Sequence, residues 1–102
     1  LPSKIRTLHS SLITLHSSRF VGEIRQRGLM VGIELVKNKT TREPFPTKDR
    51  VGYRVCMKAR DYGVILRPLG DVIVLMPPFS ITPAEIRRLV SAVQSSITAT
   101  LE

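Results

Sequence analysis

The sequence predicts an α+β fold in which helices cover one face of a mostly antiparallel sheet. Three helical patterns bracket two pairs of short apolar runs, which gives the element order α-β-β-α-β-β-α. Each pair of runs is separated by a short turn that contains glycine, and such turns are typical of hairpins. Helices before, between and after two strand pairs favour an α+β sandwich.

Length and composition indicate one globular domain. The chain has 102 residues, of which 42% are hydrophobic and 24% are charged. These fractions are ordinary for a folded domain with a core. No apolar run approaches the roughly 20 residues that cross a bilayer, and residues 1–20 lack the pattern of a signal peptide. The single cysteine, Cys56, cannot form an internal disulfide, so a reducing cytoplasm is the simplest compartment.

The two ends of the chain suggest a piece of a longer protein. The first residue is Leu1 instead of methionine, so we expect the chain to begin inside a longer reading frame. One interpretation of the final Leu101-Glu102 is a dipeptide left from an affinity tag.

Residues 1–16 are expected to form the first helix. Their apolar side chains recur at the 4-3-4-3 spacing of a helical stripe, at Leu1, Ile5, Leu8, Leu12 and Leu15. His9 and His16 have no carboxylate or cysteine at metal-ligand spacing, so we expect capping or surface roles for them.

Residues 20–36 contain two β-like runs around Gly28. In the first run, a mainly apolar face alternates with a polar face on which Val21 is the exception. The second run, residues 29–36, is nearly all apolar, which predicts a more central strand with both faces covered. Glu34 is its one charge, and it either pairs with a basic neighbour on the next strand or lies where the strand reaches solvent.

Residues 37–46 are expected to form a loop that Phe45, between two prolines, anchors to the body of the domain.

Thr47 is the predicted N-cap of the next helix, with Asp49 in its first turn, where a negative charge suits the helix dipole. Gly63 is expected to end this helix as a C′ glycine. The predicted buried stripe consists of Val51, Val55, Ala59 and Tyr62.

Residues 63–79, GVILRPLGDVIVLMPPF, are predicted to form two short apolar strands joined by a turn at residues 69–71.

The segment Thr82-Pro83-Ala84-Glu85 then predicts a helix start with a capping box and a proline at the first helical position. The apolar stripe of this last helix is Ile86, Leu89, Val90, Val93 and Ile97.

The net charge of +8 leaves two classes of partner open. A basic balance of this size can indicate nucleic acid or an anionic surface. The charges are, however, spread through residues 37–60 with Glu43 and Asp49 among them and Asp61 just beyond. This spacing favours a solvated face, or one that meets acidic surface on another domain, over a nucleic-acid site. The basic residues concerned are Lys37, Lys39, Arg42, Lys48, Arg50, Arg54, Lys58 and Arg60.

The sequence holds no complete catalytic apparatus. It has no phosphate-binding glycine loop, no metal-ligand spacing and no nucleophile elbow. What remains is Arg67, a lone cation among apolar residues. Its guanidinium can bind a carboxylate with two parallel hydrogen bonds, and Pro68 biases it toward extended geometry. Either Arg67 is a carboxylate-binding residue, or it is an arginine at a strand end whose charged head reaches water.

Two stretches resemble a known family. VGEIRQRGLMVGIELV, followed by ARDYGVILRPLGDVIVLMPPFSIT, is similar to the C-terminal small domain of class III (fold-type I) pyridoxal-phosphate aminotransferases. The resemblance covers about residues 20–97. RGLM, GIEL and MPP are shared by class III enzymes generally. The ILRPLG…LMPP combination is more specific, and it favours the branch of biotin biosynthesis over relatives that act on ornithine or γ-aminobutyrate.

This resemblance implies an activity and a role for Arg67. It implies that S-adenosylmethionine gives its amino group to 8-amino-7-oxononanoate, by way of pyridoxal phosphate, and that 7,8-diaminononanoate is formed. Arg67 matches the arginine that binds the keto-acid carboxylate. Leu69 and Val74 match positions near the substrate where some members carry aromatic residues. Some members use lysine as the amino donor, and the residues leave that alternative open.

The resemblance also implies that most of the enzyme lies outside this chain. The large domain would carry the lysine that holds the cofactor, so no residue here is expected to be catalytic and no metal is expected. We expect the isolated chain to be monomeric, inactive and unable to bind pyridoxal phosphate, whereas intact members of the family are homodimers. Two alternatives remain, a basic module that binds nucleic acid and an interaction domain without chemistry.

Overall fold

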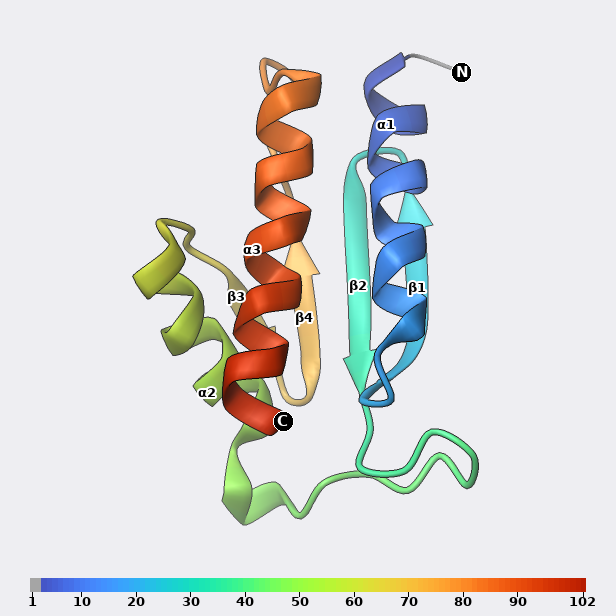
Figure 1. Ribbon diagram of the computed structural model, residues 1–102, viewed down its shortest axis with the longest axis vertical. Helices are drawn as coiled ribbons and strands as arrows, with labels where there is room; N and C mark the ends of the chain where they lie inside the picture. Colours follow the sequence, from blue (N-terminus) through green and yellow to red (C-terminus); the bar gives the residue numbers. More distant parts are fainter. Residues whose placement is uncertain (1–2) are drawn as a thin grey trace.

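The computed structural model describes residues 3–102, and it places a four-stranded sheet behind helices that cover one of its faces (Figure 1). The predicted order of helices and strands is confirmed. The elements are α1 (Ser3–Leu12), η1 (Ile13–Ser17), β1 (Val21–Arg27), β2 (Met30–Leu35), η2 (Thr47–Asp49), α2 (Val51–Ala59), η3 (Arg60–Tyr62), β3 (Arg67–Leu69), β4 (Val72–Leu75) and α3 (Pro83–Leu101).

The strands lie in the order β1-β2-β4-β3, and every neighbouring pair is antiparallel. Gly28 and Gly70 turn the two hairpins with φ angles of +59° and +61°. Glycine adopts these left-handed angles without the steric cost that a β-carbon brings. β2 and β4 form the centre of the sheet, so the short β3, which carries Arg67, is an edge strand.

The core lies between the sheet and the helices. Alternate residues of the central strands point to the helices and are buried, among them Ile33 and Leu35 in β2 and Ile73 and Leu75 in β4. The apolar stripes of the helices pack against these strand residues. The buried helical residues in this cluster are Leu8, Leu12, Val51, Val55, Cys56, Ile86, Val90, Val93 and Ile97. Among residues 3–102, no helix has the length and apolar character to cross a membrane.

The first helical segment is shorter than predicted. Helix α1 ends at Leu12, and residues 13–17 tighten into a 3-10 turn. Leu8, Leu12 and Leu15 are buried as the stripe predicts, and Ile5 is half-buried. Leu1 lies outside the described residues.

A register shift explains the exceptional Val21. β1 slips by one residue between Val21 and Glu23, so Val21 pairs with Leu35 and points to the core. Glu23, Arg25 and Arg27 point to the opposite face. One bulged residue therefore places an apolar side chain correctly on a face that strict alternation assigns to polar residues.

The prediction that both faces of the second strand are covered is wrong for this chain. β2 is central, but its residues alternate between buried positions and positions that solvent reaches, such as Gly32, Glu34 and the exposed Met30. All the helices pack on one face. The other face of the sheet, which we call the helix-free face, is therefore open in residues 3–102.

Two predictions for the second helix are also wrong. Thr47 does not cap it, because residues 47–49 form a separate 3-10 turn and Arg50 takes a left-handed conformation (φ 47°) before α2 begins at Val51. Tyr62 is 44% exposed, because residues 60–62 tighten into a 3-10 turn that rotates it away from the stripe. Gly63 ends the segment with a φ of +82°, as predicted.

Three further local predictions are confirmed. The Thr82 hydroxyl accepts a hydrogen bond from the backbone N–H of Glu85, and the Glu85 carboxylate accepts one from the backbone N–H of Thr82, which completes the capping box of α3. Phe45 anchors its loop, since its ring lies 6.0 Å from that of Phe20 at the border of the core. Cys56 is buried, and burial raises the pKa of its thiol to about 11.

Candidate functional site

Arg67 lies on the helix-free face, at the free edge of the sheet. It begins β3 and stands directly opposite Val74, which stands opposite Gly32, which stands opposite Arg25. Directly opposite residues of antiparallel strands point to the same face. Because Ile73 points to the helices, this row of four residues points away from them.

The two arginines at the ends of that row have different surroundings. Arg25 forms ion pairs with Glu23 (Nε to Oε2, 3.4 Å) and with Glu34 (Nη2 to Oε2, 3.9 Å). Glu34 therefore pairs with the adjacent strand, which was one of its two predicted roles. Within residues 3–102, Arg67 is exposed and has neither an ion pair nor a side-chain hydrogen bond. Its positive charge is the one on this row that the sheet does not neutralise.

Pro68 suits the position beside Arg67. Proline has no N–H to donate, so within sheets it is confined to edges and strand ends. Pro68 lies in an edge strand opposite Ile73. The proline thus costs the sheet no hydrogen bond with a further strand, and it restricts the backbone of Arg67 to extended conformations.

Large apolar side chains are exposed around the hairpin. Leu69, which shares the helix-free face with Val72, is 71% exposed. Val74 is half-buried. The other strongly exposed apolar side chains near the hairpin and on β2 are Ile65 (84%), Phe79 (75%), Met76 (62%) and Met30 (53%). Exposed apolar side chains that lie together mark surfaces that another protein segment or a ligand covers.

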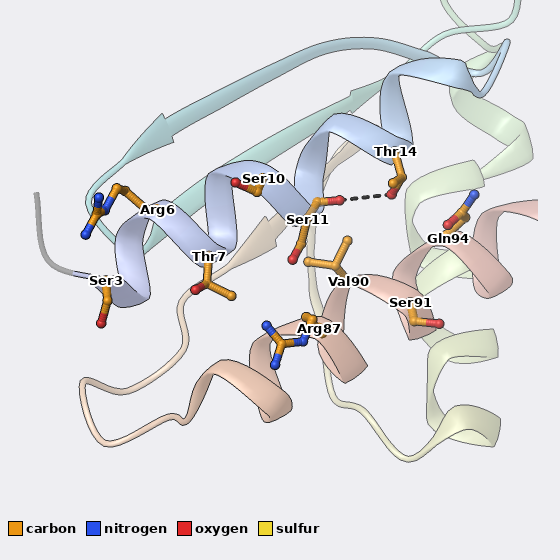
Figure 2. Close-up of a pocket in the computed structure, with 10 residues that line it drawn as sticks. All are labelled: Ser3, Arg6, Thr7, Ser10, Ser11, Thr14, Arg87, Val90, Ser91 and Gln94. Atoms are coloured by element: carbon orange, nitrogen blue, oxygen red, sulfur yellow. Dashed lines mark hydrogen bonds between the residues drawn. The ribbon is translucent and has the colours of Figure 1, made fainter.

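Arg67 itself lines neither of two hollows in the described part of the molecule. One groove, of about 700 Å³, runs between α1 and α3 and is lined mainly by hydroxyl side chains with Arg6 and Arg87 (Figure 2). A hollow of about 360 Å³ lies between residues 62–66, the end of β4 and the first turns of α3, and Val74 is one of its lining residues. An exposed arginine outside any enclosed pocket can complete a site only together with another surface.

The residues described do not fit pyridoxal phosphate. Such a site needs a lysine beside an enclosed cavity, and a carboxylate for the pyridinium nitrogen. No lysine of residues 3–102 is buried. Lys4 bonds the carbonyl of Phe79 (2.6 Å), and Lys58 pairs with Asp61 (3.3 Å). No step of the cofactor's chemistry can be assigned to these residues. In the same part of the chain, no three His, Cys, Asp or Glu side chains are grouped as metal ligands.

Gly52 and Asp71 support the hairpin in a way that the sequence does not reveal. Gly52 is buried in the first turn of α2, and its backbone N–H donates to Oδ1 of Asp71 (3.4 Å). The sequence indicates only that Asp71 belongs to a turn. The one available signal for Gly52 is a glycine inside a helical pattern, which costs stability unless a close contact requires it.

Comparisons with known proteins agree with this geometry. The model of the family "Aminotransferase class-III" matches residues 3–97. An adenosylmethionine-8-amino-7-oxononanoate aminotransferase of Geobacter sulfurreducens is 48% identical over 97 residues, which are 95% of this chain and 21% of that protein. The chain thus spans about a fifth of the length of this relative.

Solved structures give the same result. The crystal structure of adenosylmethionine-8-amino-7-oxononanoate aminotransferase from Methanocaldococcus jannaschii superimposes with a TM-score of 0.95 at 44% identity, over 99% of this chain and 23% of that one. A PMP-bound aminotransferase from Vibrio fluvialis superimposes with a TM-score of 0.89 at 28% identity, over 96% of this chain and 23% of that one. The expected resemblance is confirmed over nearly the whole chain: it belongs to the class III aminotransferases.

Proposed function

We propose that this chain is the small domain of an enzyme that aminates 8-amino-7-oxononanoate to 7,8-diaminononanoate in biotin biosynthesis, with S-adenosylmethionine as the amino donor. One observation carries the proposal. Arg67 is an exposed cation without an acidic partner among residues 3–102. It lies on the helix-free face of a domain that is 48% identical to a relative named adenosylmethionine-8-amino-7-oxononanoate aminotransferase.

The chemistry of Arg67 suits this substrate. 8-Amino-7-oxononanoate has a nine-carbon chain with a carboxylate at one end and the reacting keto group near the other. A guanidinium binds a carboxylate through two parallel charge-assisted hydrogen bonds. The exposed Leu69 and the half-buried Val74 lie beside it and offer apolar contact to the methylene chain. Arg67 would hold the far end of the substrate, and so orient the keto group.

The rest of the polypeptide supplies the chemistry. Pyridoxal phosphate, when bound there, would carry the amino group from donor to acceptor. The residues of this chain bind and orient one substrate. We also propose that the large domain of the same polypeptide covers the exposed Met30. We further propose that the intact protein is a homodimer, and that it acts in the cytoplasm, where the free Cys56 stays reduced.

Activity of the full-length protein tests this proposal. We expect it to form 7,8-diaminononanoate from 8-amino-7-oxononanoate when S-adenosylmethionine is present. Lysine in place of S-adenosylmethionine tests the other donor. Ornithine and γ-aminobutyrate as amino donors, with a common keto acid as acceptor, test the related activities. Efficient turnover of either of these, with no product from 8-amino-7-oxononanoate, would overturn the proposal.

A further inference from the structure

The β3–β4 hairpin rests on the N-terminus of α2 through backbone contact. A β-carbon built on Gly52 would overlap the carbonyl oxygen of Gly70, and it would lie 3.2 Å from Cα of Asp71. Both are backbone atoms, which cannot rotate away as the end of a long side chain can. The helix and the turn are therefore as close as glycine allows, and a larger residue at position 52 must push them apart.

The hairpin also supplies the cap that α2 lacks. Arg50, at the N-cap position, has a left-handed backbone and makes no side-chain hydrogen bond to the helix. In place of a local cap, Oδ1 of Asp71 accepts from the backbone N–H of Gly52 (3.4 Å). A carboxylate near a helix N-terminus is favoured by the helix dipole. The carbonyl of Asp71 accepts from the N–H of Leu35 at 2.8 Å, so this one residue joins α2, β2 and the hairpin.

Arg67 depends on this contact for its position. Only Pro68 and Leu69 separate it from Gly70, and β3 pairs with β4 over only three residues, Arg67–Leu69. In the part of the chain that the structure describes, β3 has no strand on its other side, and Figure 1 shows that α2 is the helix beside it. A strand this short has few hydrogen bonds of its own to fix its angle to the sheet.

We infer that Gly52 and Asp71 are positioning residues: they hold the hairpin against α2 and so place the Arg67 guanidinium where the keto-acid carboxylate binds. This inference rests on the proposed function of Arg67. Neither residue touches the substrate in this account. Both act through the distance between the first turn of α2 and the turn at Gly70.

Substitutions in the full-length enzyme test the inference. A misplacement of about 1 Å away from the reacting atoms can slow an enzyme about 100-fold. We expect Gly52→Ala to lower kcat/KM for the keto-acid half-reaction at least tenfold, and to change the half-reaction with the amino donor less than threefold. Asp71→Ala should lower the same constant several-fold. Asp71→Asn keeps an acceptor oxygen and should restore most of the loss.

Two comparisons separate positioning from a general loss of structure. Asp49→Ala removes an exposed carboxylate three residues before Gly52. Among residues 3–102, no side chain forms a hydrogen bond or an ion pair with this carboxylate. The substitution should therefore leave both half-reactions unchanged. In an Arg67→Ala background, Asp71→Ala should have less than a twofold further effect, because two residues that act through one contact are not additive.

The outcomes are distinguishable. If Arg67→Ala slows the keto-acid half-reaction selectively but Gly52→Ala and Asp71→Ala do not, the positioning inference is wrong and the proposed function stands. Equal losses in both half-reactions for Asp71→Ala, or an undiminished effect of Asp71→Ala in the Arg67→Ala background, would also overturn the inference. If Arg67→Ala itself has no selective effect, the proposed role of Arg67 fails first.

Discussion

Arg67 stands directly opposite Val74 at the edge of the sheet, and the next residue in that row, Gly32, has no side chain. The row therefore has only one small apolar side chain between Arg67 and the distant Arg25. Arg25 already has two carboxylates, Glu23 and Glu34. No residue of this row carries a negative charge that could neutralise Arg67, so the row itself leaves this guanidinium unpaired.

The isolated chain should not bind pyridoxal phosphate. Its lysines lie at the surface, outside any enclosed site, and one exposed arginine cannot enclose a cofactor. A titration of pyridoxal phosphate with the 102-residue chain, followed by absorbance, should show no saturable change and no covalent attachment after reduction with borohydride. A stoichiometric attachment at one lysine would contradict this expectation.

The capping box should make a measurable contribution to the stability of α3. Thr82→Ala removes the hydroxyl that accepts from the N–H of Glu85, and the loss of such a cap costs about 1 kcal/mol in the free energy of unfolding. Thr98→Ala, at an exposed position late in the same helix, is the control and should cost less. Urea unfolding of both variants measures the difference, and equal losses would show that the cap contributes nothing.

The same box should make stability depend on pH in the acid range. The hydrogen bond from the Thr82 backbone N–H lowers the pKa of Glu85 in the folded state. Because the pKa of Glu85 is lower in the folded state, the chain gains stability at pH values above the pKa of the unfolded state. This gain is lost as the pH falls through the pKa of the folded state. Unfolding curves of the wild type and of Glu85→Gln should therefore differ at neutral pH and converge in acid. Curves that keep a constant separation would contradict the assignment.

Cys56 should be unreactive while the chain is folded. Burial raises the pKa of its thiol from 9.0 to about 11, so at pH 8 the folded chain has about 100-fold less thiolate than the unfolded chain. Because the pKa is raised in the folded state, the contribution of the neutral Cys56 thiol to the free energy of unfolding is fully present below about pH 9. This contribution falls as the pH rises toward about 11. Cys56→Ala should lack this part of the alkaline loss. Rapid labelling of the native chain by a thiol reagent would show that the site is open.

Binding of nucleic acid should be weak and non-specific. The basic residues of 37–60 are scattered, and some already have partners: Arg50 lies over the ring of Tyr53 (4.2 Å), and Lys58 pairs with Asp61. A labelled oligonucleotide titrated at two ionic strengths should show binding that is weak, independent of sequence and lost at the higher salt concentration. Tight, sequence-selective binding at physiological salt would favour the alternative function.

Local patterns predicted most of the fold. The alternation of the first β-like run, the glycine turns and the capping box each depend on near neighbours in sequence, so their elements could be placed from the sequence. The errors came where distant segments decide the structure. Threonine is a favourable N-cap residue, but α2 begins only after the left-handed Arg50 and not after Thr47. The residue that caps α2 is Asp71, which lies in the turn of the β3–β4 hairpin.

The sequence predicts one residue of the candidate site, Arg67, but not Gly52 and Asp71, which hold its hairpin in place. Arg67 is conspicuous because it is a lone cation in an apolar segment before a proline. The face on which it lies depends on the β2–β4 pairing, which joins segments about 40 residues apart, and no local pattern contains that register. Gly52 and Asp71 were missed for the same reason, since their contact exists only after the hairpin docks on α2.

The most direct test of the account compares Arg67→Ala with Arg25→Ala in the full-length enzyme, in separate half-reactions. Both arginines lie in one row of the same face, but only Arg67 lacks an acidic partner among residues 3–102. Loss of a charge-assisted hydrogen bond costs roughly 1.5–3 kcal/mol, which is about 10- to 150-fold in a rate or binding constant. We predict that Arg67→Ala weakens the keto-acid half-reaction by at least this much and spares the half-reaction with the amino donor, while Arg25→Ala changes neither selectively. Equal loss in both half-reactions for Arg67→Ala would show that Arg67 is structural and would contradict the account.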